Sequence, residues 1–287
     1  MEVSIIIVNH NTKKLTRQTI ETVIDNTENI DYEIIVVDNS TDSSQKFEFF
    51  HEKVNILLDI NNFGFGNACN IGARLAKGDF LLFLNSDTII HENTIGKCIE
   101  YLKKENNIGS LGVRVILENG MLDHGCKRGF PTPQSALYYY LGLDKKYPES
   151  KKYGAYRQTF ISEYETKEVD SVSGSFMIVP KTVFEELNGF DETFFMYGED
   201  LDLCFRIKEK KYRIIYFADT YIIHLKGQSG LHTKSKFVIY HFYNAMLLFY
   251  KKHYKKKYNT MVTIAVYSGI KFKYFLTILK MKTRGIL

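Results

Sequence analysis

The chain has 287 residues, 45% hydrophobic and 25% charged, which excludes wholesale disorder and fits one large domain or one domain with an appendage. Its net charge of +5 is unevenly distributed: residues 1–219 carry 25 basic and 33 acidic side chains, whereas residues 220–287 carry 13 basic ones and no acidic one. This carboxylate-free quarter predicts an anionic partner, either nucleic acid or a lipid surface.

Three short apolar runs predict buried strands, over residues 3–8, 33–37 and 80–84. Strands covered by helices on both faces look like this, because neither face meets water. Apolar residues at helical spacing follow the first and third runs, over residues 15–24 and 95–102. The alternation predicts an open, mostly parallel α/β sheet with helices on both faces, in which ligands bind beyond the carboxyl ends of the strands.

Polar residues follow each of these predicted strands. Asn9 and His10 follow the first, Asp38 and Asn39 the second, and the sequence Asn-Ser-Asp at 85–87 the third. Ordinary turn or N-cap chemistry explains one such cluster. Three clusters at consecutive strand ends predict a binding edge.

A glycine-rich turn, residues 61–70, lies between the second and third strands and opens a predicted helix that runs to about Ala76. It fails the dinucleotide-binding G-x-G-x-x-G pattern by one position, because Cys69 stands where the third glycine is needed.

The four cysteines, at positions 69, 98, 126 and 204, are far apart and show no C-x-x-C spacing. This excludes a disulfide framework or a zinc site of that type and indicates reduced thiols. The first apolar run, residues 5–8, is too short for the hydrophobic region of a signal peptide. Both observations predict a cytoplasmic chain.

The middle of the chain, residues 109–170, is the least patterned part. Two prolines, many tyrosines and mixed charges predict loops and short elements around a substrate cleft, and no role is assigned to His124 or Arg128. Regular patterning returns with a predicted strand over residues 172–179 and a predicted helix over residues 181–188.

An acidic cluster then opens another predicted helix, where Glu199, Asp200 and Asp202 follow the aromatic residues 194–197. Acidic side chains in a first helical turn complement the helix dipole, which explains one or two of them without a site. We expect Asp202 to pair with Arg206, four residues further on, rather than to act in chemistry.

Seven segments in this order resemble the family 2 glycosyltransferases of the GT-A fold, in particular the rhamnosyltransferase-like branch that builds bacterial surface polysaccharides. The segments are SIIIVNHNT (4–12), VVDNSTDSS (36–44), NNFGFGNACNIG (61–72), FLNSD (83–87), GSFMIVPK (174–181), GFDETFFMYGEDLDLCFR (189–206) and His224. The resemblance covers about residues 3–227 and implies a sugar transferase with a Rossmann-like nucleotide-binding sheet.

The resemblance also implies a role for each matching residue on the donor side. Asn9 and Asp38 would contact the base and ribose of the nucleotide, with Asn39 nearby. Asn67 and Asn70, on the glycine-rich turn, would help to hold the nucleotide.

The same resemblance implies a metal site and a catalytic base. Asp87 closes the family's D-x-D-type motif and would bind Mg²⁺ or Mn²⁺ bridging the donor diphosphate, and His224, after a predicted strand, would complete that site. The motif opens with Asn85 rather than Asp, which leaves one strong protein carboxylate and suits Mg²⁺ with its retained water ligands. Asp200 matches the catalytic base, and Glu199 either positions the acceptor or caps the helix.

Sugar transfer makes two demands on side chains that these residues meet. A sugar hydroxyl is a poor nucleophile, so a carboxylate must accept its proton, and a divalent cation must stabilise the departing diphosphate. Asp200 and Asp87 are the candidates, and a base opposite the leaving group predicts inversion at the anomeric carbon. A glycoside hydrolase would pair two carboxylates across the bond, and the sequence identifies no such pair.

Residues 231–287 predict a basic, amphipathic helical tail. A first helix is expected over residues 237–258, and after Met261 a second one presents six apolar residues on one face: Ile264, Ala265, Phe272, Phe275, Leu276 and Leu279. Lys271 and Lys273 inside this stretch argue against a spanning helix, whereas lysines beside an apolar stripe suit a helix in the membrane interface. A helical pair packed on the chain's own acidic domain, or a homodimer contact, is the alternative.

Together these features predict a GT-A catalytic domain over residues 1–230, with a nucleotide-sugar-binding part (1–108) and an acceptor-binding part (109–230), followed by the tail. We expect an inverting, metal-dependent enzyme that moves a sugar from dTDP-rhamnose or a UDP-sugar to a lipid-linked or growing surface glycan. It would act at the inner face of the cell membrane, held by anionic lipid and without a nucleic-acid partner. The alternatives are a nucleic-acid-binding protein and a catalytically inactive nucleotide-sugar-binding scaffold.

Overall fold

The structure, a computed structural model, describes residues 1–58, 60–225 and 235–283. Its strands are β1 (Val3–Asn9), β2 (Tyr32–Asp38), β3 (Val54–Leu57), β4 (Phe80–Leu84), β5 (Thr88–Ile90), β6 (Ile108–Leu117), β7 (Lys167–Glu168), β8 (Phe176–Pro180) and β9 (Arg213–His224). Its α-helices are α1 (Lys13–Asp25), α2 (Phe65–Leu75), α3 (Thr94–Lys104), α4 (Pro133–Tyr140), α5 (Leu143–Lys146), α6 (Lys181–Glu186), α7 (Glu199–Glu209), α8 (Lys236–Phe249) and α9 (Thr260–Thr283).

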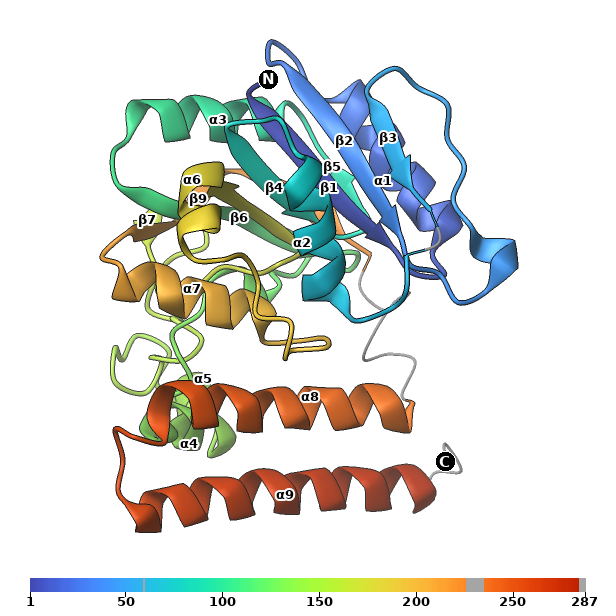
Figure 1. Ribbon diagram of the computed structural model, residues 1–287. Helices are drawn as coiled ribbons and strands as arrows, with labels where there is room; N and C mark the ends of the chain where they lie inside the picture. Colours follow the sequence, from blue (N-terminus) through green and yellow to red (C-terminus); the bar gives the residue numbers. More distant parts are fainter. Residues whose placement is uncertain (59, 226–234, 284–287) are drawn as a thin grey trace.

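One mixed sheet forms the centre of the molecule, with the strand order β3-β2-β1-β4-β8-β6-β9-β5 and β7 paired to β9 (Figure 1). Strands β1 to β4 are parallel, and every residue of β1 and β2 is buried, as their continuous Ile and Val runs predicted. Beyond β4 the sheet becomes mixed, because β8 runs antiparallel to both β4 and β6. The predicted α/β sheet with covering helices is confirmed.

The structure differs from the sequence-based expectations in the middle of the chain. A ten-residue strand, β6 (Ile108–Leu117), lies between β8 and β9, and all but its first residue falls in the region expected to form loops and short elements. Its two glycines and Arg114 break the continuous apolar pattern by which buried strands are recognised. Strand β8 begins at Phe176, four residues later than expected. A turn at residues 174 and 175 precedes it, and the backbone N–H of Gly174 bonds Asp200 of α7 instead of a neighbouring strand.

The tail forms two helices that run side by side along the lower edge of the molecule (Figure 1). The first, α8, continues from Phe249 into a π-helical turn, Tyr250–Tyr254, which we call the π-turn. A second hydrophobic core joins Ala245, Phe249 and the π-turn to Phe205 of α7. The first tail helix therefore packs on α7 of the same chain, while the expected boundary at residues 230 and 231 lies outside the described residues.

The second tail helix, α9, is exposed along the apolar stripe that the sequence predicted. Ile264, Phe272 and Phe275 are each about 60% exposed. Apolar side chains also line the opposite side, where Tyr274 contacts Tyr243 of α8 and Tyr267 contacts Tyr250 of the π-turn. The helix α9 is therefore apolar on two faces rather than amphipathic. Its 24 residues are long and apolar enough to cross a bilayer, contrary to the expectation drawn from its lysines, although one such helix does not by itself establish a span.

Candidate active site

The carboxyl ends of the parallel strands meet at one edge of the sheet, because the strands pair in register. Asn9, the last residue of β1, lies opposite Asp38, the last residue of β2, and Leu84 at the end of β4 lies opposite Ile7. The polar clusters that follow these strands are therefore brought together, as predicted.

Asn9 and Asp38 form a buried pair at this edge. The Asn9 side-chain amide donates to Asp38 Oδ1 at 3.1 Å and to Ser40 Oγ at 2.9 Å, and its oxygen accepts from Thr16. Burial disfavours the ionised carboxyl of Asp38, but hydrogen bonds from Ser40, Phe47 and Asn9 outweigh this and lower its pKa. Asp38 is thus held ionised, and Asn9 orients it from within the protein; the predicted base and ribose contacts stay predictions.

The other asparagines predicted for the nucleotide have well-defined partners. Asn39 donates to the side chain of Asn62 at 3.3 Å. Asn67 and Asn70 both donate to the carboxylate of Glu192, at 2.8 and 2.9 Å, and Asn70 also bonds the backbone of Phe190 in both directions. These two residues therefore join the start of α2 to the segment before α7.

The glycine-rich turn makes a close approach to that same segment. Gly64 has a φ of +106°, and a Cβ there would lie 2.3 Å from the carbonyl oxygen of Phe195, which accepts a hydrogen bond from the backbone of Phe65. Only glycine fits this position. A Cβ on Gly66 would lie 3.7 Å from the Cβ of Glu199, so the first turns of α2 and α7 adjoin.

A second polar cluster forms where β5 meets β9. Because these strands are antiparallel and pair Thr88 with His224, Asp87 lies beside that histidine. His224 Nε2 is 3.0 Å from Asp87 Oδ1 and 3.4 Å from the Asn85 amide, while its Nδ1 is 3.9 Å from Asp123. Burial opposes protonation of the imidazole, but Asp123 and Asp87 outweigh it and raise the pKa of His224 to about 9.

This cluster fits a divalent cation held partly by the substrate. Asp87 and His224 are both buried, and a carboxylate with an imidazole is a suitable donor set. Within the described residues, no three His, Cys, Asp or Glu side chains are grouped so as to hold an ion. The remaining ligands would have to come from diphosphate oxygens and water, as is usual for Mg²⁺.

The candidate base, Asp200, lies in the first turn of α7 and is held on one side. Arg128 Nη2 donates to Asp200 Oδ2 at 2.7 Å, and the backbone N–H of Gly174 donates to the same oxygen at 3.1 Å. Arg128 is itself fixed by two backbone hydrogen bonds to Ser171. The other oxygen, Oδ1, accepts from the backbone of Leu201.

Glu199, next to Asp200, is buried, and its Oε2 has no hydrogen-bond partner among the described residues. Burial and the charge of Asp200 raise the pKa of Glu199 to about 8, so this carboxyl is protonated at neutral pH. Asp202, as predicted, pairs with Arg206, whose Nε lies 2.8 Å from its Oδ2. The role of Glu199 at the acceptor stays a prediction.

Two residues of this site were missed by the sequence reasoning. Arg128 and Asp123 both come from the region after β6, where no local pattern marks a site. Each reaches its partner across a long sequence separation, 72 residues in the case of Arg128 and Asp200. Only knowledge of the position of β6 in the sheet could have placed them.

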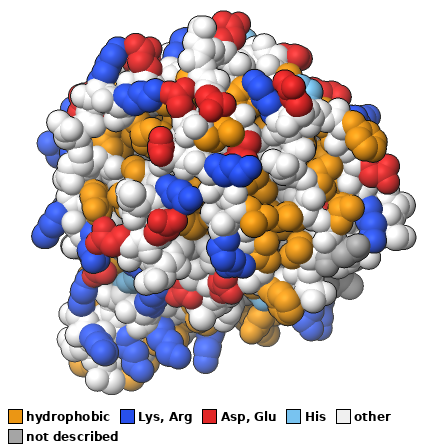
Figure 2. Space-filling model, turned by 45° about the horizontal axis from the view of Figure 1, so that its top comes forward, with side chains coloured by type: hydrophobic (Ala, Val, Ile, Leu, Met, Phe, Trp, Pro, Cys, Tyr) orange, Lys and Arg blue, Asp and Glu red, His pale blue; other side chains and the backbone are white. Residues whose placement is uncertain are grey.

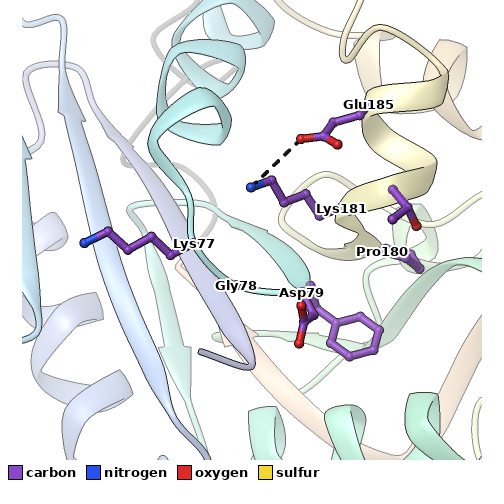
Figure 3. A pocket seen from close by; sticks show the side chains of 8 residues that line it. Lys77, Gly78, Asp79, Pro180, Lys181 and Glu185 are labelled. Carbon is purple, nitrogen blue, oxygen red and sulfur yellow. Dashed lines mark ion pairs between the residues drawn. The ribbon is translucent and has the colours of Figure 1, made fainter.

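A surface pocket of about 430 Å³ lies elsewhere and is lined by Lys77, Asp79, Pro180, Lys181 and Glu185, among others (Figure 3). It opens beside Phe80, the first residue of β4, whereas Asn85 follows the last residue of that strand. The pocket is therefore at the opposite end of β4 from the candidate site and does not belong to it.

The chain matches the model of glycosyl transferase family 2 over residues 4–187, and that of the N-terminal domain of galactosyltransferase over residues 159–227. It is 30% identical to rhamnosyltransferase WbbL of Escherichia coli K12 over 231 residues, covering 77% of this chain and 83% of that one. It is 25% identical to N-acetylglucosaminyl-diphospho-decaprenol L-rhamnosyltransferase of Mycobacterium tuberculosis over 209 residues, covering 68% and 67%.

Solved structures show the same fold at low identity. A mannosyltransferase from Pyrobaculum calidifontis, in complex with GDP-Man and Mn²⁺, superposes with a TM-score of 0.58 at 15% identity, covering 100% of this chain and 76% of that one. S. aureus TarS 1–349 with UDP-GlcNAc gives 0.55 at 20% identity, covering 86% and 65%. With the sheet, the strand-end site and the family match in agreement, the chain belongs to glycosyl transferase family 2, and its activity is glycosyl transfer.

Proposed function

We propose that this transferase is inverting and metal-dependent, with a nucleoside diphosphate sugar as donor and a hydroxyl of a lipid-linked or growing surface glycan as acceptor. The geometry of Asp200 carries the proposal. Arg128 and the backbone of Gly174 both donate to one of its oxygens. Asp200 lies in the first turn of α7, and this turn adjoins the glycine-rich turn.

In this mechanism Asp200 accepts the proton of the acceptor hydroxyl while the new glycosidic bond forms. Because two donors occupy Oδ2, we assign the proton to Oδ1. Arg128 stays protonated throughout and fixes the carboxylate, since the neighbouring Asp200 raises its pKa further against the effect of burial. Attack from the side opposite the diphosphate inverts the anomeric carbon.

Asp87 and His224 are the residues that would hold Mg²⁺ or Mn²⁺ against the donor diphosphate, with Asn85 beside them. When bound, the ion supplies stabilisation of the negative charge that develops on the departing diphosphate. Asp38, held ionised by its hydrogen bonds, is suited to accept from ribose hydroxyls or a base N–H.

The comparisons support the choice of substrates. The names of two bacterial rhamnosyltransferases favour rhamnose as the sugar, and we propose dTDP-rhamnose as the donor, with a UDP-hexose as the alternative. The mycobacterial relative's name favours a lipid-linked diphosphate acceptor. The exposed apolar stripe of α9 and the lysines of the tail favour an anionic membrane surface as its location. Basic side chains gather at the lower left end of the molecule in Figure 2, the end at which α8 turns into α9 in Figure 1.

A panel of nucleotide sugars tests the donor. Thermal shift with and without Mg²⁺ or Mn²⁺ should single out one nucleotide, with stabilisation that depends on the metal. Product analysis by NMR would then give the anomeric configuration, and retention of configuration would contradict the proposed mechanism.

Asp200→Asn tests the base within the same assay. The variant keeps the shape of the side chain but cannot take the proton, so transfer should fall by roughly 10²- to 10⁴-fold. Donor binding should stay close to that of the wild type. Asp79→Asn, at the opposite end of β4, is the matched control, and normal turnover in Asp200→Asn would exclude the assignment.

A further inference from the structure

The π-turn of the tail contacts two acidic side chains, Asp202 in α7 and Asp191 before it. Lys252 Nζ and His253 Nε2 each lie 2.7 Å from Asp202 Oδ1, and Lys252 also pairs with Asp191. Asp202 is fully buried, and His253 is 5% exposed. The contact of His253 with Asp202 thus lies inside the protein, whereas Lys252, about a third exposed, reaches the same carboxylate from the surface.

Asp202 is two residues beyond the candidate base on the first turn of α7. Its other oxygen is bonded by Arg206, whose guanidinium also donates to the backbone carbonyls of Leu187 and Gly189. Burial disfavours the ionised carboxyl, but His253, Arg206 and Lys252 outweigh it and lower the pKa of Asp202. An ionised, buried carboxylate with three basic partners fixes the elements that carry them relative to one another.

Aromatic packing extends this connection to the other side of the base. The His253 ring lies 4.1 Å from that of Phe205 in α7, and Phe205 packs against Phe130 with ring centres 4.9 Å apart. Phe130 is two residues from Arg128, which bonds Asp200 directly. The π-turn thus packs on α7 and, through Phe205, on the segment that supplies the partner of the base.

We propose that Lys252 and His253 are positioning residues for the transfer reaction, which hold the first turn of α7, and with it Asp200, in its reactive orientation. The tail is then part of the active site's scaffold as well as a membrane contact. The inference rests on the proposed role of Asp200 as base. It assigns the two tasks of the tail to different parts: the π-turn to the site, and α9 to the lipid surface.

The full-length double variant Lys252→Met, His253→Leu removes both contacts, and Lys251→Met, Lys255→Met changes two exposed residues of the same segment as the control. We expect kcat to fall by about 10- to 100-fold in the double variant, because small displacements of a catalytic group cost this much. The donor KM should not change, and Lys252→Arg should keep most of the activity. Hydrogen exchange should become faster in the first turn of α7 and remain unchanged in α3.

Different failures can be told apart. A double variant with a lower melting temperature but normal kcat, assayed well below that temperature, would reduce the π-turn to a stabilising contact and overturn the inference. If the double variant does not fold, the single variant Lys252→Met is measured against the same criteria. If the wild-type chain transfers no sugar from any donor, the proposed function fails. Independently of activity, hydrogen exchange in α7 that is the same in the double variant and the wild type would reject the positioning role.

Discussion

The guanidinium of Arg128 donates a 2.7 Å hydrogen bond to Oδ2 of Asp200, linking the region after β6 to the first turn of α7. Neither side chain is more than about a fifth exposed. Two donors, Arg128 and the Gly174 N–H, bond Oδ2, whereas Oδ1 accepts one bond, from the backbone of Leu201. If Asp200 is the base, as proposed, Oδ1 is therefore the oxygen that would face the acceptor.

Arg128→Ala should lower kcat by about 10²-fold with little change in donor affinity, because the base loses its orientation but the nucleotide site does not. Arg128→Lys should retain part of the activity, since a lysine supplies the charge without the planar fork. Steady-state kinetics with varied donor separates the two constants. A change in donor KM alone would mean that Arg128 binds the donor instead.

Asp87→Ala should abolish the metal dependence of nucleotide binding, because the chain supplies few other ligands at that corner. Calorimetric titration of the nucleotide with and without Mn²⁺ measures this directly. Asp79→Asn, before the opposite end of β4, should behave like the wild type. Metal-enhanced binding that survives in Asp87→Ala would remove this residue from the ligand set.

Glu199→Gln should make stability less dependent on pH. The folded-state pKa of this carboxyl is raised from 4.5 to about 8, so its contribution to stability is fully present below pH 4.5 and is lost as the pH rises through about 8. A glutamine has no proton to lose. The melting temperature of the variant, relative to that of the wild type, should thus rise between pH 5 and 8. A difference in melting temperature that does not change over this pH range would contradict a protonated Glu199.

Gly64→Ala should destabilise the fold by more than the roughly 1–3 kcal/mol of a strained backbone alone, because its Cβ would also collide with the carbonyl of Phe195. Gly120→Ala is the matched control, since Gly120 also has a positive φ but nothing within 4 Å of the added Cβ. Urea unfolding of both variants gives the difference. Equal losses would show that the turn moves to accept the methyl group.

Charge substitutions on the exposed stripe of α9 test the membrane contact. Phe272→Glu with Phe275→Glu should release the protein from anionic liposomes, because each substitution removes a lipid-facing ring and adds a repelled charge. Phe50→Glu, a highly exposed ring outside the tail, should not. Sedimentation with liposomes of defined phosphatidylserine content gives the bound fraction. Unchanged liposome binding of the Phe272→Glu, Phe275→Glu variant would contradict the lipid-facing role of α9. A chain truncated near Lys234, a point outside the described residues, that still sediments with liposomes would contradict it as well.

The parts of the site that lie at strand ends could be predicted from local sequence. Buried strands leave continuous apolar runs, so the edge with Asn9 and Asp38 followed from the pattern alone. The Asp87 and His224 corner needed the family resemblance, since the two residues are 137 positions apart and meet only because β5 pairs with β9.

Contacts between distant segments could not be predicted in this way. The position of β6 between β8 and β9 places Arg128, and the docking of the tail places His253. Neither Arg128 nor His253 belongs to a periodic pattern. In the sequence, a side chain that will have a buried polar partner looks like any exposed polar or charged residue. The basic tail was correctly identified as helical, but its composition did not reveal that one part faces the protein and the other is exposed.

The π-turn fixes the number of residues between the apolar face of α8 and the side chains that contact Asp202. A π-turn is one residue wider than a turn of α-helix, so it sets the rotational phase between the helix before it and the residues after it. Deleting the exposed Lys251 would restore α-helical spacing and rotate Phe249 relative to His253 by about 100°. The apolar contacts of α8 and the contacts of Lys252 and His253 with Asp202 could then no longer form together. Deletion of a single residue, without loss of any contacting side chain, would therefore separate the tail from α7.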